Sequence, residues 1–293
     1  MSSLPNPEAD WEQPAWGHSI TLAGIQERIG PLEDPPSLLP GGHTNLNLRL
    51  CPSKVLRIFR HDPKASGKEA ALLRRTWKHL RVPRVFSRGA DFILMENVHH
   101  KPLEDKPDHG ARVGRALAEI HSKAYAAAGT LDADLDLDRR TPDFVQSLVE
   151  RAAGKTRDAF SDLRDGVAAL LARTRGFLVD AAGPAVLLHG DFKPSNLFET
   201  SFGLLVLDWE LACAGPALVD VATLLRWAPP EAFVSAFEKG YQDGGGRLPQ
   251  GWRKAARLFD LVGLVELLGN TAPGTRRAHD VRQLIERTVA EAA

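Results

Sequence analysis

The strongest constraint on this chain is a short polar segment that lies between two apolar runs. Residues 189–196 read His-Gly-Asp-Phe-Lys-Pro-Ser-Asn and follow the apolar run 186–188. A second apolar run, 204–207, leads directly into Asp208-Trp209-Glu210. Short apolar runs bounded by turn residues are typical of strands. Because open sheets hold ligands and reacting groups at the ends of their strands, both polar segments are candidates for a functional site.

Three oxygen-bearing side chains in these segments have a spacing that predicts a metal site. Asp191 and Asn196 are five residues apart in one loop, and Asp208 follows twelve residues after Asn196 on the next strand. Mg²⁺ binds few protein oxygens and leaves coordination positions for phosphate and water. The alternative is a strand–turn–strand in which His189 and Asp191 form a structural hydrogen bond and Asn196 caps a turn. The full spacing with Asp208 favours the metal site.

The same residues resemble the catalytic loop of kinases. The pattern H-x-D-x-x-x-x-N is present with Gly190 where protein kinases have Arg, and their metal-binding D-F-G here reads D-W-E. Gly215-Pro216 and Asp220 follow this D-W-E segment. From about Gly41 to Trp227, the chain therefore resembles the aminoglycoside phosphotransferase family, the small-molecule branch of the protein-kinase-like fold.

The resemblance implies an α+β, two-lobed protein-kinase-like fold. We expect a small mixed-sheet N-terminal lobe that binds nucleotide over residues 1–97. Its first 40 residues, rich in Pro, are expected to form an irregular lead-in over the surface. Residues 98–293 are expected to form a mostly helical C-terminal lobe with the catalytic loop and the acceptor pocket.

Hydrophobic periodicity predicts individual elements of both lobes. Alternating Leu residues over 46–50 and the apolar run 55–59 indicate a hairpin. A helix is expected over 67–80, followed by short strands at 84–86 and 92–95. Apolar residues at helical spacing then predict helices over 108–121, 143–150, 160–179, 218–225 and 281–289.

The resemblance also implies roles for residues of the catalytic loop. Asp191 would accept or orient the proton of the acceptor hydroxyl, and Lys193 would reach the γ-phosphate. Asn196 and Asp208 would hold Mg²⁺ across the nucleotide phosphates, because phosphoryl transfer is catalysed mainly by positioning and charge neutralisation. A solvated surface charge is the open alternative for Lys193.

The N-terminal lobe would supply the rest of the nucleotide site. A pair of glycines at 41–42 takes the place of the loop that covers the phosphates, where backbone N–H groups approach the oxygens. Arg57 stands where the family has Lys, and its guanidinium can pair with phosphate and with Glu69. The alternative for Arg57 is a surface cation, and the alternative for the two glycines is an ordinary lead-in to the hairpin. The predicted nucleotide-binding residues are Gly41, Gly42, Thr44, Asn45, Arg57, Glu69, Glu96 and Val98.

The amino-acid composition limits the classes of partner and the cellular compartment that we expect for this chain. The chain has 37 Lys or Arg and 37 Asp or Glu, so it has no bulk field that would hold it on nucleic acid or on an anionic membrane. Cys51 and Cys213 are too few for a disulfide framework and lack metal-ligand spacing. No apolar run approaches the roughly 20 residues of a membrane span. We expect a cytoplasmic protein with small-molecule partners.

These patterns predict an Mg²⁺-dependent kinase that transfers the γ-phosphoryl group of ATP or GTP to a hydroxyl of a small molecule. Residues 211–293 carry 10 Lys or Arg and 9 Asp or Glu, which weakly disfavours a polycationic aminoglycoside. Choline, thiamine, homoserine, sugar and macrolide acceptors stay open. The alternatives are a nucleotide-binding pseudokinase that acts as a sensor or scaffold, and a hydrolase that uses the metal on water.

Overall fold

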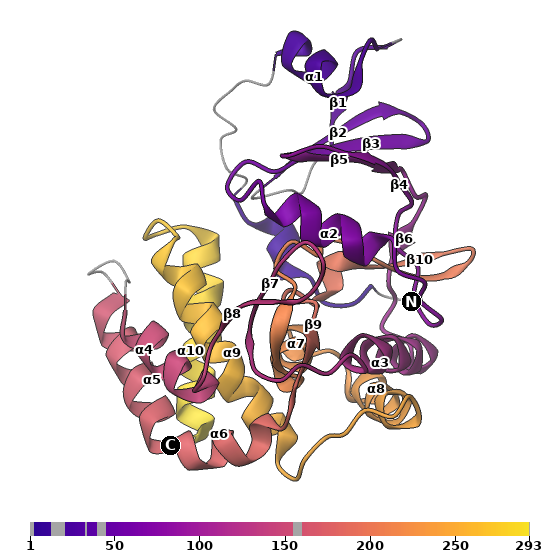
Figure 1. Cartoon of the computed structure of the whole chain (residues 1–293). Helices are drawn as coiled ribbons and strands as arrows, with labels where there is room; N and C mark the ends of the chain where they lie inside the picture. The colour runs from indigo at the N-terminus through magenta and orange to yellow at the C-terminus, as the bar shows by residue number, and fades with distance from the viewer. Residues whose placement is uncertain (1–2, 13–20, 33, 40–44, 155–159, 293) are drawn as a thin grey trace.

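Alternating apolar residues build an antiparallel sheet in the N-terminal lobe, at the top of Figure 1. The computed structural model describes residues 3–12, 21–32, 34–39, 45–154 and 160–292. Within these residues the sheet has five strands in the order β1-β2-β3-β5-β4. The predicted hairpin is confirmed, and in it Leu48 pairs with Leu56. The strands are β1 (Ser37–Leu38), β2 (Leu46–Cys51), β3 (Lys54–Ile58), β4 (Val85–Arg88) and β5 (Phe92–Glu96).

Two helices cover this sheet (Figure 1). Ile25 of α1 (Leu22–Ile29) is buried in one cluster with Leu48 and Leu56. The second helix, α2 (Ala65–Leu73), lies beside β4 and β5. The helix predicted over 67–80 is therefore too long. Its chain leaves helical geometry because Trp77 folds back, donates from Nε1 to the carbonyl of Leu72 (3.2 Å) and stacks on Trp209.

The C-terminal lobe is mostly helical, which confirms the predicted α+β, two-lobed fold; the boundary at residues 97 and 98 stays a prediction. None of the helices in the described ranges has the length and apolarity that a membrane crossing needs. Figure 1 shows α3 beside α8, and α4, α5, α9 and α10 grouped on the other side of the lobe. The helices are α3 (Pro107–His121), α4 (Phe144–Ala153), α5 (Ser161–Arg173), α6 (Arg175–Ala182), α7 (Leu218–Leu225), α8 (Glu231–Asp243), α9 (Trp252–Gly269) and α10 (Arg276–Ala292).

The single helix predicted over 160–179 is wrong, because α5 ends at Arg173 and α6 begins at Arg175. Between them, Thr174 has φ −95° and ψ 7°, outside the α-helical range. Its hydroxyl donates to the carbonyl of Leu170 (2.8 Å). Such a back-bond to the preceding turn competes with the helical ladder and bends helices. Apolar periodicity continues across the break and gives no sign of it.

Both strands predicted beside the catalytic segment are confirmed, although they belong to different sheets. β9 (Ala185–Leu188) pairs with β12 (Cys213–Pro216) in a sheet with β7 (Gly129–Leu131) and β8 (Leu137–Arg140). β11 (Gly203–Val206) pairs with β10 (Leu197–Thr200), which pairs with β6 (Lys101–Pro102). The polar segment 189–196 therefore joins the two sheets.

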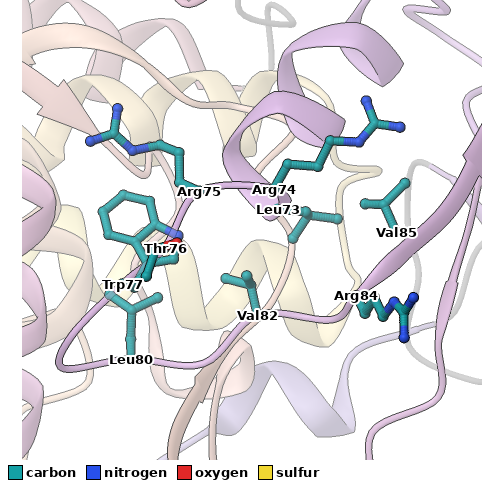
Figure 2. Close-up of a pocket in the computed structure, with 9 residues that line it drawn as sticks. All are labelled: Leu73, Arg74, Arg75, Thr76, Trp77, Leu80, Val82, Arg84 and Val85. Carbon is teal, nitrogen blue, oxygen red and sulfur yellow. The ribbon is translucent and has the colours of Figure 1, made fainter.

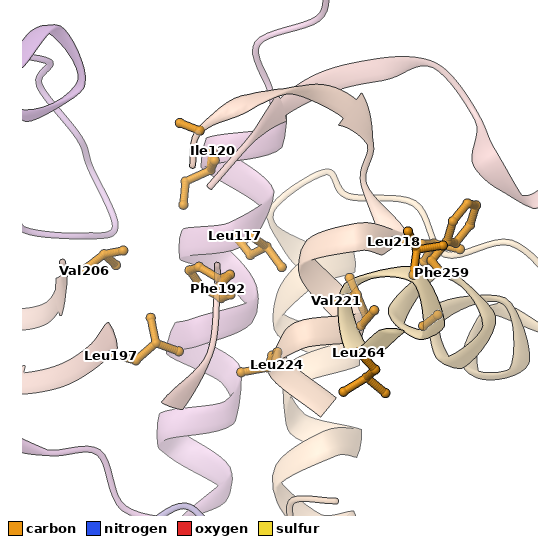
Figure 3. Packing of buried hydrophobic residues seen from close by; sticks show 14 of the residues in the cluster. Leu117, Ile120, Phe192, Leu197, Val206, Leu218, Val221, Leu224, Phe259 and Leu264 are labelled. Carbon is orange, nitrogen blue, oxygen red and sulfur yellow. The ribbon is translucent and has the colours of Figure 1, made fainter. Parts of the chain in front are cut away.

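Apolar packing fixes this segment to the helices beneath it. Phe192 lies inside the catalytic segment and is fully buried. Figure 3 shows it close to Leu117 of α3, in the same buried cluster as Leu197 and Leu224. Burying one large apolar side chain contributes about 1.5–3 kcal/mol. The loop between β9 and β10 is thus held by the core.

The expected irregular lead-in over the surface holds for residues 30–32 and 34–36, which form no helix or strand and are not buried, but it is wrong for residues 3–12 and for the helix at 22–29. A 3-10 helix, η1 (Pro7–Asp10), precedes α1. Leu4 and Trp11 are buried against the C-terminal lobe, where Trp11 packs edge-on against Trp227 (5.8 Å between ring centroids). Ser3 forms a bridge with Glu104, and Figure 1 places this end of the chain beside β6 and β10. The proline-rich sequence of this segment gave no measure of its burial.

Small residues bring α3 and α8 into close contact. A Cβ added to Gly114 of α3 would overlap the carbonyl oxygen of Phe237. The same holds for Gly240 of α8 against the carbonyl of Ala111. The two backbones therefore approach closely at positions where no side chain fits, and overpacking such a contact costs about 1–3 kcal/mol.

We predict that Gly114→Ala lowers the free energy of unfolding by about 1–3 kcal/mol, measured by urea denaturation. Gly166→Ala is the matched control, because Gly166 is exposed on α5 and no neighbouring atom lies within 4 Å of an added Cβ. Alanine there raises stability by about 0.5–1 kcal/mol through helix propensity. Equal effects of the two substitutions would contradict the close helix contact.

Candidate active site

A buried carboxylate holds the backbone of the catalytic segment. Asp220, at the start of α7, is fully buried, and its Oδ2 accepts from the backbone N–H of His189 (2.7 Å). Its Oδ1 accepts from the N–H of Gly190 (2.9 Å). His121 Nε2 also donates to Asp220 (3.2 Å), while its Nδ1 accepts from the hydroxyl of Tyr241 (2.7 Å). Asp220 therefore anchors the segment from below and lies outside the reacting groups.

Gly190 is required by the backbone of this segment. Its φ is +83°, in the left-handed region, and an added Cβ would overlap the carbonyl oxygen of Leu211. Glycine alone adopts such a conformation without steric cost. The replacement of the kinase Arg by Gly in H-G-D thus follows from the close approach of residues 190 and 211.

The structure brings Asp191, Asn196 and Asp208 into one region. Asn196 Nδ2 donates to the Oδ2 of Asp191 (3.0 Å) and to its backbone carbonyl (2.9 Å). The N–H of Leu207 donates to the carbonyl of Asn196 (3.0 Å), which sets Asp208 next to the loop. Asp208 has φ +69°, an uncommon conformation for a non-glycine residue. Backbone strain of this kind clusters at functional sites.

Arg57 joins the two lobes through a cluster of carboxylates. Its Nη2 donates to Asp208 Oδ1 and lies 3.4 Å from Glu210 Oε2. Its Nε lies 3.4 Å from Glu69 Oε2, an ion pair without hydrogen-bond geometry. The expected pair of Arg57 and Glu69 is present, and Asp208 is the closer partner. The alternative of a surface cation does not hold, because Arg57 is 5% exposed.

Negative charge exceeds positive charge around Arg57. Among the described residues, this guanidinium meets three carboxylates, those of Glu69, Asp208 and Glu210. Burial raises the pKa of Glu69 to about 7, although Arg57 acts in the opposite direction. For Asp208, whose side chain is only partly buried, loss of hydration favours the neutral form, but Arg57 outweighs it and the pKa lies below its ordinary value. A divalent cation would be attracted by this excess negative charge.

The donor set fits Mg²⁺ shared with a nucleotide. Asn196 and Asp208 offer an amide and a carboxylate, and the side chain of Asp208 is 40% exposed. Over the described residues, no group of three or more His, Cys, Asp or Glu is arranged to hold a metal unaided. Mg²⁺ commonly binds through one or two protein ligands plus substrate phosphates. The residues present therefore suit a metal that arrives with the nucleotide.

Lys193 is half-buried and lies between two carboxylates, so the alternative of a solvated charge does not hold. Its Nζ lies 3.1 Å from Asp191 Oδ2 and 2.8 Å from Glu8 Oε2. Burial alone would lower the pKa of Lys193, but Asp191 and Glu8 outweigh it and the pKa lies above its ordinary value. Glu8 comes from the N-terminal segment, and no motif marked it in the sequence.

Other predicted nucleotide-binding residues have mixed placements. Gly41, Gly42 and Thr44 lie outside the described residues. Asn45 is buried, and its Nδ2 donates to Glu210 Oε2 (2.6 Å). Glu96 accepts hydrogen bonds from Arg81 (2.6 Å) and from the N–H of Arg84 (3.2 Å), so its carboxylate binds other residues of the N-terminal lobe. Val98 is buried just beyond β5, and its carbonyl accepts from His100 Nδ1 (2.6 Å).

Sequence patterns missed Glu8, Arg226 and Trp227 as neighbours of the catalytic loop. Arg226 and Trp227 follow the end of α7, and both contact Glu8. Arg226 also binds Asp260 of α9 through two nitrogens (2.6 and 3.0 Å). The only sequence signal for Arg226 and Trp227 is their position directly after the helix that contains Asp220. Contacts between residues so far apart in the chain leave no local pattern.

An open pocket of about 470 Å³ lies away from these residues, between the end of α2 and β4. Figure 2 shows Leu73, Val82 and Leu80 along it, with the side chains of Arg74 and Arg75 extending in opposite directions. None of the site residues predicted from sequence lines this pocket. The segment 189–196, rather than this pocket, carries the polar side chains that the sequence predicts for the site.

Solved structures share this fold at low sequence identity. The GDP complex of aminoglycoside 2'-phosphotransferase-IIIa has a TM-score of 0.70 at 15% identity, over 92% of this chain and 97% of that one. A choline/ethanolamine kinase family protein from Mesorhizobium loti has a TM-score of 0.61 at 19% identity, over 92% and 91%. Macrolide 2'-phosphotransferase MphH from Brachybacterium faecium has a TM-score of 0.61 at 18% identity, over 92% and 96%. Curated protein sequences give no match.

The family comparison agrees with the catalytic loop. The model described as the phosphotransferase enzyme family matches residues 37–258. This range contains the N-terminal sheet, the H-G-D segment, Asp208 and the Asp220 anchor. Since the match covers most of the chain and includes the residues that the fold brings together, the chain belongs to the phosphotransferase enzyme family.

Proposed function

We propose that this phosphotransferase is a kinase that transfers the γ-phosphoryl group of Mg²⁺-bound ATP or GTP to a hydroxyl of a small molecule. The observation that carries the proposal is the joint placement of Asp191, Asn196 and Asp208 at the junction of the two lobes. GDP occupies solved neighbours of the same fold, which supports a nucleotide co-substrate here. Cys51 and Cys213 are both free, in keeping with the cytoplasmic location that we propose.

Asp191 is the group that we assign to the acceptor hydroxyl. Asn196 and Lys193 both bind its Oδ2, so two contacts hold this oxygen in place. A base held in this way receives the hydroxyl proton as the oxygen attacks phosphorus. Preorganised positioning of this kind supplies most of the catalysis in phosphoryl transfer.

Arg57 and Lys193 are the cations that we assign to the phosphates, and Asn196 and Asp208 would hold Mg²⁺. When bound, Mg²⁺ would neutralise charge on the transferring group. Arg57 reaches Asp208 from β3, so the N-terminal lobe and the metal-ligand residue are already linked. The guanidinium fork can keep one carboxylate contact while another nitrogen meets a phosphate oxygen.

We predict that Asp191→Asn lowers kcat by at least about a hundredfold, because the base is lost. The nucleotide KM stays within about threefold, because the phosphate contacts remain. Nucleoside diphosphate release with a panel of hydroxylated metabolites and antibiotics measures the rate. Asp243→Asn on α8, in an exposed pair with Lys239, is the control that keeps wild-type activity.

Wild-type turnover by Asp191→Asn would contradict the assignment of the base. A pseudokinase gives a different result with the unaltered protein. Nucleotide raises its melting temperature, yet no compound in the panel causes diphosphate release. The contact of Arg57 with Asp208 is the observation that favours this second candidate, since it occupies one oxygen of a metal-ligand residue.

Asp208→Asn separates the metal role from nucleotide binding. We predict that the Kd of Mg²⁺·ATP rises at least about tenfold, since a carboxylate ligand is lost. The Kd of ATP measured in EDTA stays nearly unchanged, because no metal is then present. Titration calorimetry measures both values. An unchanged Kd for Mg²⁺·ATP would show that this carboxylate is not a ligand.

Arg57→Lys tests whether the guanidinium fork matters beyond its charge. A lysine reaches one carboxylate at a time, so we predict a fall in kcat/KM of about tenfold. Arg57→Met leaves three carboxylates without their cation and lowers stability by about 3–5 kcal/mol. Steady-state kinetics and thermal melting measure the two effects. Wild-type values for both variants would contradict the role of this cluster.

A further inference from the structure

The N-terminal segment, residues 3–12, runs along the C-terminal lobe beside the catalytic loop. At its start, the N–H of Leu4 donates to the carbonyl of Leu103 (2.9 Å). Near its end, Trp11 Nε1 donates to Asp280 of α10 (2.9 Å). Glu8 lies between these two attachments and enters the space next to Asp191. This segment thus crosses the region where an acceptor must approach the base.

The carboxylate of Glu8 sits among three donors. Lys193 Nζ lies 2.8 Å from Oε2, and Trp227 Nε1 donates to Oε1 (3.1 Å). Arg226 Nη1 lies 3.7 Å from Oε1. The side chain of Glu8 is 9% exposed. Burial by itself would raise the pKa of Glu8, but Lys193 and Arg226 outweigh it and the pKa lies below the ordinary value.

The donors are held in place by partners other than Glu8. Arg226 is bound by Asp260 through two nitrogens, and Lys193 is bound by Asp191. Trp227 packs against Trp11. If Glu8 left, these groups would keep their positions and present two cations and an indole N–H to one point. Groups of this kind recognise a carboxylate, because each offers donors and none offers an acceptor.

We propose that Lys193, Arg226 and Trp227 form a binding site for the carboxylate of the acceptor, and that Glu8 occupies this site within the chain until the acceptor displaces it. The inference rests on the proposed kinase function, whose acceptor class it names: a small hydroxycarboxylic acid. Its carboxylate takes the place of that of Glu8, and its hydroxyl faces Asp191.

The position of Lys193 sets the distance between the two ends of such an acceptor. One ammonium contacts both Glu8 and Asp191, so a carboxylate at the first position is close to the base at the second. A hydroxyl a few bonds from the carboxylate therefore reaches Asp191. A polycationic acceptor would instead meet Lys193 and Arg226, and like charges at short distance oppose its binding.

Glu8→Gln tests the proposal without requiring turnover. The amide keeps the shape of the side chain and lacks the charge, so it competes less well for the site. We predict that Glu8→Gln binds D-glycerate about tenfold more tightly than the unaltered protein, measured by calorimetry without nucleotide. Glycerol and choline, which lack a carboxylate, show no such gain. Glu12→Gln is the matched control, because Glu12 is in the same segment and binds the backbone of Arg276.

Equal affinity of Glu8→Gln and the unaltered protein for D-glycerate would overturn the proposal. An equal gain for glycerol or choline would also overturn it, since the segment would then act as a general obstacle. These outcomes leave the kinase assignment standing if Asp191-dependent turnover is found with an uncharged acceptor. Tighter glycerate binding without any turnover supports the carboxylate site and counts against the kinase.

A second measurement uses the unaltered protein, which covers the case where Glu8→Gln does not fold. A Glu-specific protease cleaves after Glu8 only when this residue leaves its site, and mass spectrometry identifies the fragment. We predict that D-glycerate raises this cleavage rate at least about threefold and that glycerol does not, because the carboxylate shifts the population. If D-glycerate does not raise the rate, the proposal fails, whatever a non-hydrolysable Mg²⁺·ATP analogue does, because Lys193 is also assigned to the γ-phosphate and the analogue can displace Glu8 from it.

Discussion

The two hydrogen bonds from the backbone of His189 and Gly190 to buried Asp220 are the interaction on which the rest of the site depends. They fix a backbone in which Gly190 has φ +83°, a conformation that glycine adopts without steric cost. A buried carboxylate left without these partners would cost several kcal/mol. The loop therefore supplies the hydrogen-bond donors that the buried Asp220 carboxylate needs, and Asp220 in turn fixes the loop backbone.

Above this anchor, charge adds to the apolar contact between Trp77 and Trp209 in linking the lobes. Arg57 on β3 meets Glu69 from α2 and Asp208 from the C-terminal lobe. A bound metal and phosphates would share these partners, so nucleotide binding and lobe contact use the same groups. On the other side of the loop, Lys193 is shared in the same way between Asp191 and Glu8. Both cations thus have partners that phosphate or an acceptor can replace.

Much of this could be predicted from the sequence, because the catalytic loop is local. Asp191 and Asn196 lie within one short segment, and the strand before Asp208 has an unmistakable apolar run. What the sequence could not predict depends on contacts between distant residues. The end of α2 is set by Trp77 stacking on Trp209, and the burial of Glu8 requires Lys193, far along the chain. The proline-rich sequence around Glu8 has the same pattern whether the Glu8 side chain is buried or exposed.

The most direct test of the central claim follows the transferred group itself. ATP with ¹⁸O in the non-bridging γ-phosphoryl oxygens is incubated with the protein, Mg²⁺ and a mixture of hydroxylated small molecules, and mass spectrometry locates the label. The account predicts a labelled phosphate monoester of one acceptor class, formed only while Asp191 is present. Label found solely in inorganic phosphate would indicate a hydrolase. Unconsumed ATP despite tight binding would indicate a pseudokinase, and either result would contradict the account.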